Sequence, residues 1–271
     1  MSFPGRQWSI LWPTKRMCTL TFVPTEDGYL VGMNRDELLT RPVALLPKRF
    51  QRSGMEMVCP SEPCGGTWIA CNDRGNLLAL LNWNASGSPL FGEKRKTRGL
   101  VIAELIGEPD LAAADSHFHQ MNLDGLFPFR LVGVFRSERT ITEWHWDGVD
   151  RRKMEFPWAR NHWYSSSLSD SLAEEERGHA CQAAAGEPAA GSSSWLRRLH
   201  RSHVPRPGPF SVCVHRQDAA TVSYTEVRCG GSQIAMDYLD GNPCLKQRFD
   251  EMTCLALKDS IVLSNLPKLQ V

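Results

Sequence analysis

Strand-forming residues and turn-forming residues succeed one another near the start of the chain, a pattern typical of an antiparallel hairpin. The stretch "CTLTFV" is strand-like, "PTEDG" supplies turn chemistry, and "YLVGMN" is strand-like again, so residues 18–35 are predicted to form a hairpin. With the turn centred near residue 26, Cys18 is expected opposite Arg35 to within about two positions, with Asn34 and Asp36 on either side of Arg35. The pattern therefore brings a cysteine close to an Asn-Arg-Asp run.

A second hairpin is predicted from "TWIAC", the turn "NDRG" at Asn72 to Gly75, and "NLLALLNW". The mixed apolar run of its second strand indicates a strand that is covered on both faces. The same pairing places Asn82 beside Gly65 and Gly66.

The remaining pattern alternates groups of helices with groups of strands. Helical spacing appears in "RGLVIAELIG", "PDLAAADSHFHQM" and "WLRRLH", and a further helix is expected from Ser169 or Asp170 to Gly186. Strands are expected in "FRLVGVF", "TITEWHWDG" and "HWYSSS", and in a hairpin of "FSVCVH" with "TVSYTEVRC". Hairpins without regular βαβ alternation predict an α+β fold, in which helices cover a largely antiparallel sheet.

Composition narrows the classes of partner. Lys and Arg number 31 against 30 Asp and Glu, a net charge of +1, so no global basic field favours nucleic acid or an acidic membrane. We find no run near the roughly 18 apolar residues that a membrane-spanning helix needs. The nine cysteines are scattered, and the apolar run before Met17 is too short for a convincing signal peptide. A cytoplasmic protein with reduced thiols is expected.

Metal and cofactor motifs are weak. Cys59, Cys64 and Cys71 are spaced C-x4-C-x6-C, which differs from the short knuckles of zinc ribbons. His117 and His119 are two residues apart on a predicted helix, so their imidazoles point in different directions. We therefore expect no metal and no cofactor.

Two polar segments have ordinary structural interpretations. At the predicted turn "HRQDA", Asp218 is expected to make a turn hydrogen bond while His215 and Arg216 contact solvent, although a substrate-binding role for these two residues stays open. The run from Glu174 to Arg177 is interpreted as the solvent-facing side of a helix.

Met17 directly before Cys18 suggests a specific chemistry. If translation begins at Met17, removal of that methionine leaves Cys18 with a thiol and a free α-amine. Reference pKa values of about 7.7 to 8.0 for the amine and about 8.5 for the thiol allow one residue to hold both nucleophile and base. Asp36 is expected to orient the amine.

Fixed amide donors are suited to stabilise the oxyanion that forms on attack, and Asn34 or Asn82 could supply them. Arg35 could pair with Asp36 or Glu37, or bind an anionic group of a substrate. The alternative from the residues alone is an ordinary edge hairpin with an "NRD" turn and a salt bridge.

Several segments carry a family resemblance. The sequence resembles the NRDE-domain proteins, also called the transport-and-Golgi-organisation family, from Met17 to about Cys244. The matching segments, in order, are Met17-Cys18, "GMNRDELLTRP" (32–42), "GGTWIACNDRG" (65–75), "LLNW" (80–83), "TRGLVIAEL" (97–105), "FPFRLVGV" (127–134) and "FSVCVHRQDAATVS" (210–223).

That family is similar to N-terminal nucleophile hydrolases of the choloylglycine hydrolase and penicillin acyltransferase type. The resemblance implies an αββα sandwich with Cys18 as nucleophile, Asp36 as partner of its amine, Asn34 beside that aspartate, and Asn82 at the oxyanion. Arg35 has no clear counterpart in these hydrolases. The serine-rich segment "YSSSLSD" (164–170) stands where many relatives have Leu-Ser-Asn, which leaves a second amide donor without a match.

The resemblance also implies a domain division and two functions. Residues 1–16 are expected to be an extension, 17–244 the domain, and 245–271 a tail of unassigned role. The first function is an amidohydrolase or acyltransferase that acts on the C–N bond of a small-molecule amide through a thioester on Cys18. The second is a ligand-binding protein without catalysis that handles lipid or haem.

Overall fold

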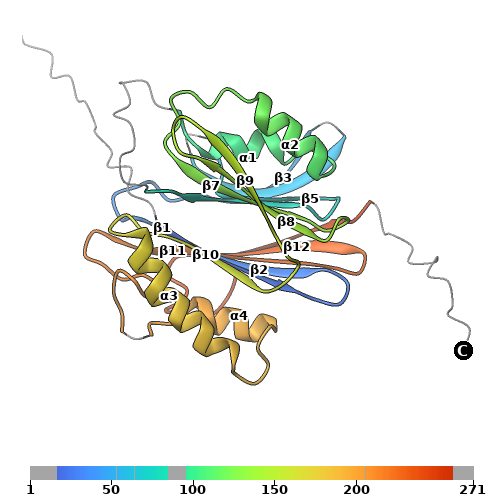
Figure 1. Ribbon diagram of the computed structural model, residues 1–271. Coiled ribbons are helices and arrows are strands. Elements are labelled where there is room, and N and C mark those ends of the chain that lie inside the picture. Colours follow the sequence, from blue (N-terminus) through green and yellow to red (C-terminus); the bar gives the residue numbers. More distant parts are fainter. Residues whose placement is uncertain (1–16, 53, 64, 85–95, 205, 259–271) are drawn as a thin grey trace, which may run out of the picture.

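The computed structural model describes residues 17–52, 54–63, 65–84, 96–204 and 206–258. The predicted extension at residues 1–16 and the cysteine at position 64 lie outside these ranges. Within them the chain forms two antiparallel sheets, one of six strands and one of seven. The sheets lie face to face, and two helices cover the outer side of each sheet (Figure 1). The predicted α+β fold with an αββα layer order is therefore confirmed.

The six-stranded sheet carries the start of the domain in its interior. Its strands, in spatial order, are β10 (Asn161–Ser165), β1 (Met17–Pro24), β2 (Tyr29–Leu38), β11 (Ala219–Gly230), β12 (Gln233–Asp240) and β13 (Glu251–Ala256). The β1–β2 hairpin has the predicted register, with Cys18 opposite Arg35. Its turn is closed by a hydrogen bond that the Thr25 amide donates to the Gly28 carbonyl, 3.0 Å long.

The seven-stranded sheet follows the order of the sequence. Its strands are β3 (Leu45–Arg52), β4 (Met55–Ser61), β5 (Ile69–Asn72), β6 (Leu77–Asn82), β7 (Phe129–Phe135), β8 (Thr140–Trp146) and β9 (Arg151–Phe156). The predicted β5–β6 hairpin is present and pairs Ile69 with Ala79 and Cys71 with Leu77.

Four helices are described, and polar side chains mark where three of them begin. The helices are α1 (Gly99–Leu105), α2 (Leu111–Gln120), α3 (Asp170–Ala185) and α4 (Ser193–His200). Asp110, Ser169 and Ser192 each accept a hydrogen bond from a backbone amide in the first turn of the helix that follows, which satisfies a donor that the helix itself leaves unpaired. Helices α1 and α2 pack on the seven-stranded sheet, and α3 and α4 pack on the six-stranded sheet.

Alternation along the strands divides the buried side chains among three layers. In β1, Leu20 and Phe22 belong to the core between the two sheets, whereas Val23 packs beneath α3 and α4. In β6, Leu81 faces the same central core, whereas Leu80 packs beneath α1 and α2. The face on which a residue lies therefore decides which layer its side chain can reach.

Two predicted segments have a different structure from the one expected. The strand expected at residues 210–215 is wrong, because its backbone groups bond within a loop: the Cys213 amide donates to the Ser202 carbonyl, and isolated bridges join Gly208 to Val214 and His215 to Ala220. Residues 251–256, placed by sequence in a tail, form β13 and pair with β12. The sheet therefore extends past the boundary expected at residue 244.

Candidate active site

The thiol of Cys18 and the carboxyl group of Asp36 lie on opposite faces of one sheet. Cys18 pairs with Arg35 of β2 and with Ser165 of β10, and its side chain belongs to the core between the sheets. Asp36 is paired with Met17, one position along, so its side chain points to the other face, toward α3. The hairpin brings the two residues together along the chain but separates their side chains by the thickness of the sheet.

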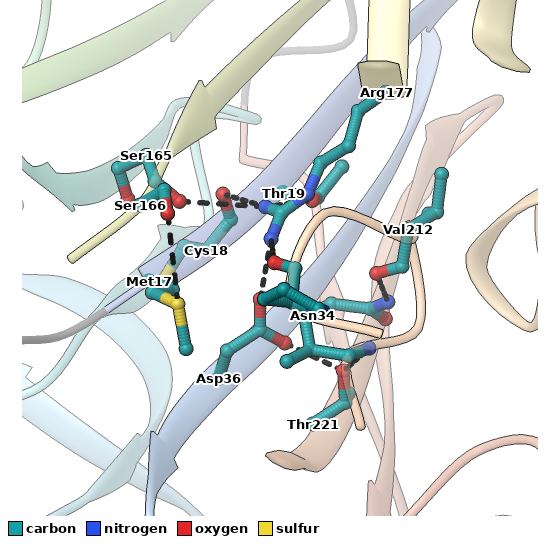
Figure 2. A network of polar contacts seen from close by, with 12 residues as sticks. Met17, Cys18, Thr19, Asn34, Asp36, Ser165, Ser166, Arg177, Val212 and Thr221 are labelled. Carbon is teal, nitrogen blue, oxygen red and sulfur yellow. Dashed lines mark hydrogen bonds and ion pairs between the residues drawn. The ribbon is translucent and has the colours of Figure 1, made fainter. Parts of the chain in front are cut away.

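Asp36 is buried beside a basic residue of α3. One oxygen of its carboxyl group accepts a hydrogen bond of 2.6 Å from the Thr221 hydroxyl, and the other lies 3.6 Å from Nη2 of Arg177 (Figure 2). Neither the Asp36 nor the Arg177 side chain is exposed to solvent. This second oxygen makes no hydrogen bond within the described residues.

The guanidinium of Arg177 also holds the backbone of the two strands beside it. It donates to the Thr19 hydroxyl at 2.9 Å and to the carbonyl oxygens of Cys18 at 3.2 Å and Ser165 at 3.4 Å (Figure 2). A further bond of 3.3 Å reaches the Pro209 carbonyl. Because its charge is shared among these acceptors, Arg177 only partly compensates for the burial of Asp36.

Burial dominates the electrostatics on both faces. It raises the pKa of Asp36 to about 7, although Arg177 and the Thr221 hydroxyl favour the ionised carboxylate. Burial also raises the pKa of the Cys18 thiol to about 12, and the negative charge of Asp36 adds to that increase. With the chain continuing into Met17, Cys18 is therefore a weak nucleophile at neutral pH.

Met17 occupies the space beside Asp36 on the helix-covered face. Its side chain is fully buried and packs against Val214 and Ala219. Its sulfur lies 3.8 Å from the Ser166 hydroxyl and 3.7 Å from Nη1 of Arg216. Removal of Met17 would therefore leave space directly beside Asp36.

The predicted turn around Arg216 is more ordered than a solvated turn. Two parallel hydrogen bonds of 2.8 and 2.7 Å join Arg216 to Asp218, and a third of 3.1 Å reaches Ser167. Arg216 thus lies over Met17, with 16% of its side chain exposed. His215 turns elsewhere and lies against His203, with 3.0 Å between their Nε2 atoms. The two residues proposed together for substrate binding therefore lie in different surroundings.

Asn34 makes hydrogen bonds that connect strand β2 to neighbouring segments. It lies on the same face of β2 as Asp36, away from the thiol, and its amide nitrogen donates to the carbonyl oxygens of His200 at 2.9 Å and Val212 at 2.8 Å. These bonds tie β2 to α4 and to the loop before β11. Asn34 therefore supports the helix-covered face of the six-stranded sheet.

Asn82 is also turned away from the thiol. It pairs with Phe129, whose ring belongs to the core beneath α1 and α2, and paired residues of antiparallel strands share a face. Asn82 is buried, with 3% of its surface exposed. Its side chain therefore points to the helix-covered face of the seven-stranded sheet, while Cys18 faces the opposite side of the central core.

Arg35 shares the face of Cys18 and is held by acidic residues. It lies 3.0 Å from Glu62 and 3.5 Å from Glu37, and its guanidinium stacks 4.3 Å from the ring centre of Trp68. Arg41 pairs with Glu62 at 2.8 Å, so two arginines and two glutamates form a network at the end of β2. The predicted pairing of Arg35 with Glu37 is found, whereas Asp36 pairs with Arg177 instead.

A cavity of about 330 Å³ adjoins this network. Arg35, Glu37 and Arg41 line one side of it, and residues from the end of β12 to Asn242 line another. Cys18 is not among the residues that line it.

Ser165, Arg177 and Thr221 are site residues that sequence reasoning missed. The prediction that Arg177 faces solvent is wrong, because the side chain is fully buried. Its spacing from the buried residues Ala173, Cys181 and Ala184 places it on the apolar stripe of α3, and this spacing was the available signal. Ser165 and Thr221 become visible only through strand pairing, since no local motif marks either residue.

Comparisons with known proteins concern the family and the layer arrangement. The family model described as "Transport and Golgi organisation 2" matches residues 17–179. No curated protein matches the chain. The structure is similar to penicillin V acylase from Agrobacterium tumefaciens, with 9% identity, a TM-score of 0.47, and coverage of 82% of this chain and 86% of that one.

It is also similar to conjugated bile acid hydrolase from Clostridium perfringens in two variant structures. One has 9% identity and a TM-score of 0.48, covering 92% of this chain and 100% of that one. The other has 8% identity and a TM-score of 0.46, covering 88% and 92%. At such identities and scores, these likenesses assign no activity and no residue's role. Among the described helices, none is long and apolar enough to cross a bilayer.

Proposed function

The chain belongs to the transport and Golgi organisation 2 family, and we propose that it cleaves or transfers the acyl group of a small-molecule amide through a thioester on Cys18. The family match confirms the resemblance that the NRDE motif and its companion segments indicated. The activity is our proposal, and it rests on the geometry of the β1–β2 hairpin.

The observation that carries the proposal is the pairing of Met17 with Asp36. In a chain that starts at Cys18, the α-amine takes the place of the Met17–Cys18 peptide nitrogen, at the strand position next to Asp36. The backbone nitrogen lies in the plane of the sheet, so a carboxyl group on one face and a thiol on the other can both act through it. Asp36 then orients the amine, and the amine acts as the base that deprotonates the thiol.

The proposed reaction follows from these positions. The amine accepts the thiol proton, and the thiolate attacks the amide carbon to form a C–S bond. The C–N bond then breaks, and the leaving amine takes the proton from the α-ammonium group. The α-amine then takes a proton from water, which attacks the thioester. The C–S bond breaks, and the α-ammonium group gives that proton to the sulfur. Transfer to another amine in place of water gives the acyltransferase variant.

Ser165 is the best-placed side chain to stabilise the oxyanion. It pairs with Cys18 across β1 and β10 on the same face, and its buried hydroxyl has no hydrogen-bond partner within the described residues. Directly paired side chains have Cβ atoms about 4.5–5.5 Å apart, close enough for the hydroxyl to donate to an oxygen on the acylated sulfur. The serine-rich segment thus supplies a donor where the family resemblance expected an amide.

The test uses a chain released by proteolysis so that Cys18 is its first residue, incubated with a short N-acyl 4-nitroanilide. We expect nitroaniline release and, after an acid quench, a mass increase of one acyl group located on Cys18. Cys18→Ala should abolish both signals, and Cys254→Ala, which changes an exposed cysteine, should leave both in place. Acyl groups found only on other residues, or turnover that survives Cys18→Ala, contradict the proposal.

A second candidate function is ligand binding without turnover, favoured by the cavity of about 330 Å³ that does not include Cys18. That volume is near the lower end of the range of about 300–1,000 Å³ for ligand sites, so it suits a small ligand or one end of a longer lipid. Titration with an acyl-coenzyme A and with haemin distinguishes the functions. Binding that survives Cys18→Ala but weakens when Val43→Trp narrows the cavity favours the carrier.

A further inference from the structure

Four sulfur and nitrogen ligands converge beside the six-stranded sheet, at a place that the proposed chemistry does not use. They belong to His203, Cys213, His215 and Cys244, and one ligand atom from each lies within 4.8 Å of every other. We infer that these residues bind a zinc ion that fixes the loop before β11. This inference is independent of the proposed hydrolysis.

The three separations measured from His215 lie near the edge lengths of a tetrahedral zinc site. Nε2 of His215 lies 3.0 Å from Nε2 of His203, 3.8 Å from the sulfur of Cys213 and 3.5 Å from the sulfur of Cys244. Zinc–nitrogen distances of about 2.0–2.1 Å and zinc–sulfur distances of about 2.3 Å give tetrahedral edges of about 3.3–3.8 Å. Small side-chain rotations therefore suffice to bring all four atoms into bonding distance of one ion.

The ligand set selects the metal and its role. Two thiolates and two imidazoles form a soft, tetrahedral set that suits zinc, whereas magnesium and calcium require oxygen ligands. All four positions are supplied by the protein, which is typical of a structural site, because a catalytic zinc keeps one position open for water or substrate. Cys213 is fully buried and the other three ligands are partly exposed, so the site has both a rigid base and a path for the ion.

Asn242 is a neighbour that would support the ligands. Its side-chain oxygen lies 3.2 Å from the Cys213 sulfur, and its side-chain nitrogen lies 3.5 Å from Nε2 of His215. A metal-bound thiolate cannot donate a hydrogen bond, so binding should rotate this amide and present its N–H₂ group to the sulfur. Before zinc binds, its oxygen also accepts from the backbone amide of Cys244, at 3.1 Å, and this bond would be exchanged when the amide rotates.

The ligands come from three segments that are far apart in the sequence. His203 follows α4, Cys213 and His215 lie in the loop before β11, and Cys244 follows β12. The same loop provides the Val212 carbonyl for Asn34 and the Pro209 carbonyl for Arg177. A zinc ion would therefore stabilise the loop that covers the Asp36 face of the sheet.

The spacing explains why the sequence did not reveal the site. Among the four ligands, only Cys213 and His215 are close in the sequence. His203 lies ten residues before Cys213, and Cys244 lies 29 residues after His215. Sequence reasoning considered Cys59, Cys64 and Cys71, and found no short knuckle there. The present cluster forms through tertiary structure.

The inference is tested on the full chain, purified with reductant, then stripped with chelator and titrated with Zn²⁺ or Co²⁺. We expect one Zn²⁺ per chain, a raised Tm, and Co²⁺ spectra with intense tetrahedral d–d bands and sulfur-to-cobalt charge transfer. Cys244→Ser and His203→Gln should weaken zinc binding by more than the roughly 10- to 100-fold loss typical of an outer partner, and Asn242→Ala should fall within that range.

Controls separate this site from others. Cys254→Ser and His119→Ala alter exposed residues elsewhere and should leave the stoichiometry and the cobalt spectrum unchanged. Because Cys213 is buried and its replacement could disturb folding, the test relies on the variants of the partly exposed residues Cys244 and His203. Absence of stoichiometric zinc, a cobalt spectrum without sulfur ligation, or a Cys213–Cys244 disulfide in the protein purified with reductant overturns the inference.

Discussion

Arg177 of α3 lies 3.6 Å from the carboxyl group of Asp36 in β2, and neither side chain reaches solvent. The pair joins the helical layer to the sheet at the point where β1 begins. Arg177 also donates to the Cys18 carbonyl, so one side chain contacts both the acid and the backbone of the candidate nucleophile. The packing of α3 therefore positions the candidate site.

Replacement of Arg177 by methionine should destabilise the fold strongly. It removes the basic partner of the buried Asp36 carboxyl group and one donor to each of three backbone carbonyl oxygens. Removing one partner of a buried ion pair typically costs about 3–5 kcal/mol in the free energy of unfolding, which urea denaturation measures. Arg198→Met, at an exposed pair with Glu187, should cost less than about 1 kcal/mol. Equal costs for the two variants would contradict the assigned role.

Asp36 should make stability depend on pH in an unusual direction. Its pKa is about 7 in the folded chain, above the ordinary 3.8, so between these values the folded state binds more protons than the unfolded state. The contribution of Asp36 to stability is therefore present below pH 4 and is lost as pH rises to about 7. At about 1.36 kcal/mol per unit, the loss is at most about 4 kcal/mol.

The comparison is with Asp36→Asn, which keeps an oxygen for the Thr221 hydroxyl but does not titrate. Urea denaturation at several pH values should show the unfolding free energy of the parent falling relative to this variant between pH 4 and 7. Parallel curves for the two proteins would show that the carboxyl group ionises in the folded state as it does in the unfolded chain.

Cys18 should become reactive only when it is the first residue. With Met17 attached, burial holds the thiol pKa near 12, whereas an adjacent α-ammonium group lowers the pKa of a thiol. Iodoacetamide at pH 8 should therefore alkylate Cys18 at least about tenfold faster in the chain that starts there. Exposed Cys254 provides the internal reference and should react equally in both chains. Equal rates at Cys18 would remove the support for amine activation.

Ser165→Ala should separate catalysis from stability. Loss of an oxyanion donor typically lowers kcat by about 10²–10³-fold, while the unfolding free energy should change by less than about 1 kcal/mol because this hydroxyl has no partner in the described residues. The readouts are steady-state kinetics on the acyl nitroanilide, with KM nearly constant, and urea denaturation. Ser171→Ala on the exposed side of α3 is the matched control. An unchanged kcat would exclude Ser165 as the donor.

Arg35→Lys should show that the network at the end of β2 requires a guanidinium. A lysine cannot approach Glu37 and Glu62 in fork geometry while stacking on Trp68. We expect a loss of about 1.5–3 kcal/mol in unfolding free energy, since hydrogen bonds to charged groups contribute that much. Arg49→Lys, at a largely exposed pair with Glu56, should change it by less than about 0.5 kcal/mol. A larger loss of unfolding free energy for Arg49→Lys than for Arg35→Lys would argue against a structural role for Arg35.

The pairing of β1 with β2 could be predicted from the sequence. The sequence also indicated which face of the sheet each side chain occupies, but the prediction did not use this information. Alternating strand formers around "PTEDG" determine both the β1–β2 hairpin and the pairing of Cys18 with Arg35. The same alternation places Asp36 on the opposite face from Cys18, which agrees with the buried contact to Arg177. Sequence reasoning treated proximity along the strand as proximity of side chains.

Edge strands and contacts between distant segments were harder to predict from the sequence. Strands β3 and β9 are largely exposed and lack the apolar alternation that marks a half-buried strand, so their sequences resemble loops. At residues 210–215 a strand was predicted where the structure has a loop. There the Val212 carbonyl accepts a hydrogen bond from Asn34, and the Cys213 amide donates one to the Ser202 carbonyl. Such partners come from distant parts of the chain, which a local pattern does not contain.

The four-residue turn at 25–28 has a consequence for how this family can vary. A single insertion or deletion within β1 or β2, between the turn and Cys18 or Asp36, would exchange the faces of the residues beyond it, whereas extra residues in the turn leave the strand pairing unchanged. With such a change in β2, Arg35 would face α3, and Asp36 would enter the core between the sheets. We therefore expect functional relatives to differ in the length and residues of the turn, while the spacing from the cysteine to the turn and from the turn to the aspartate stays fixed.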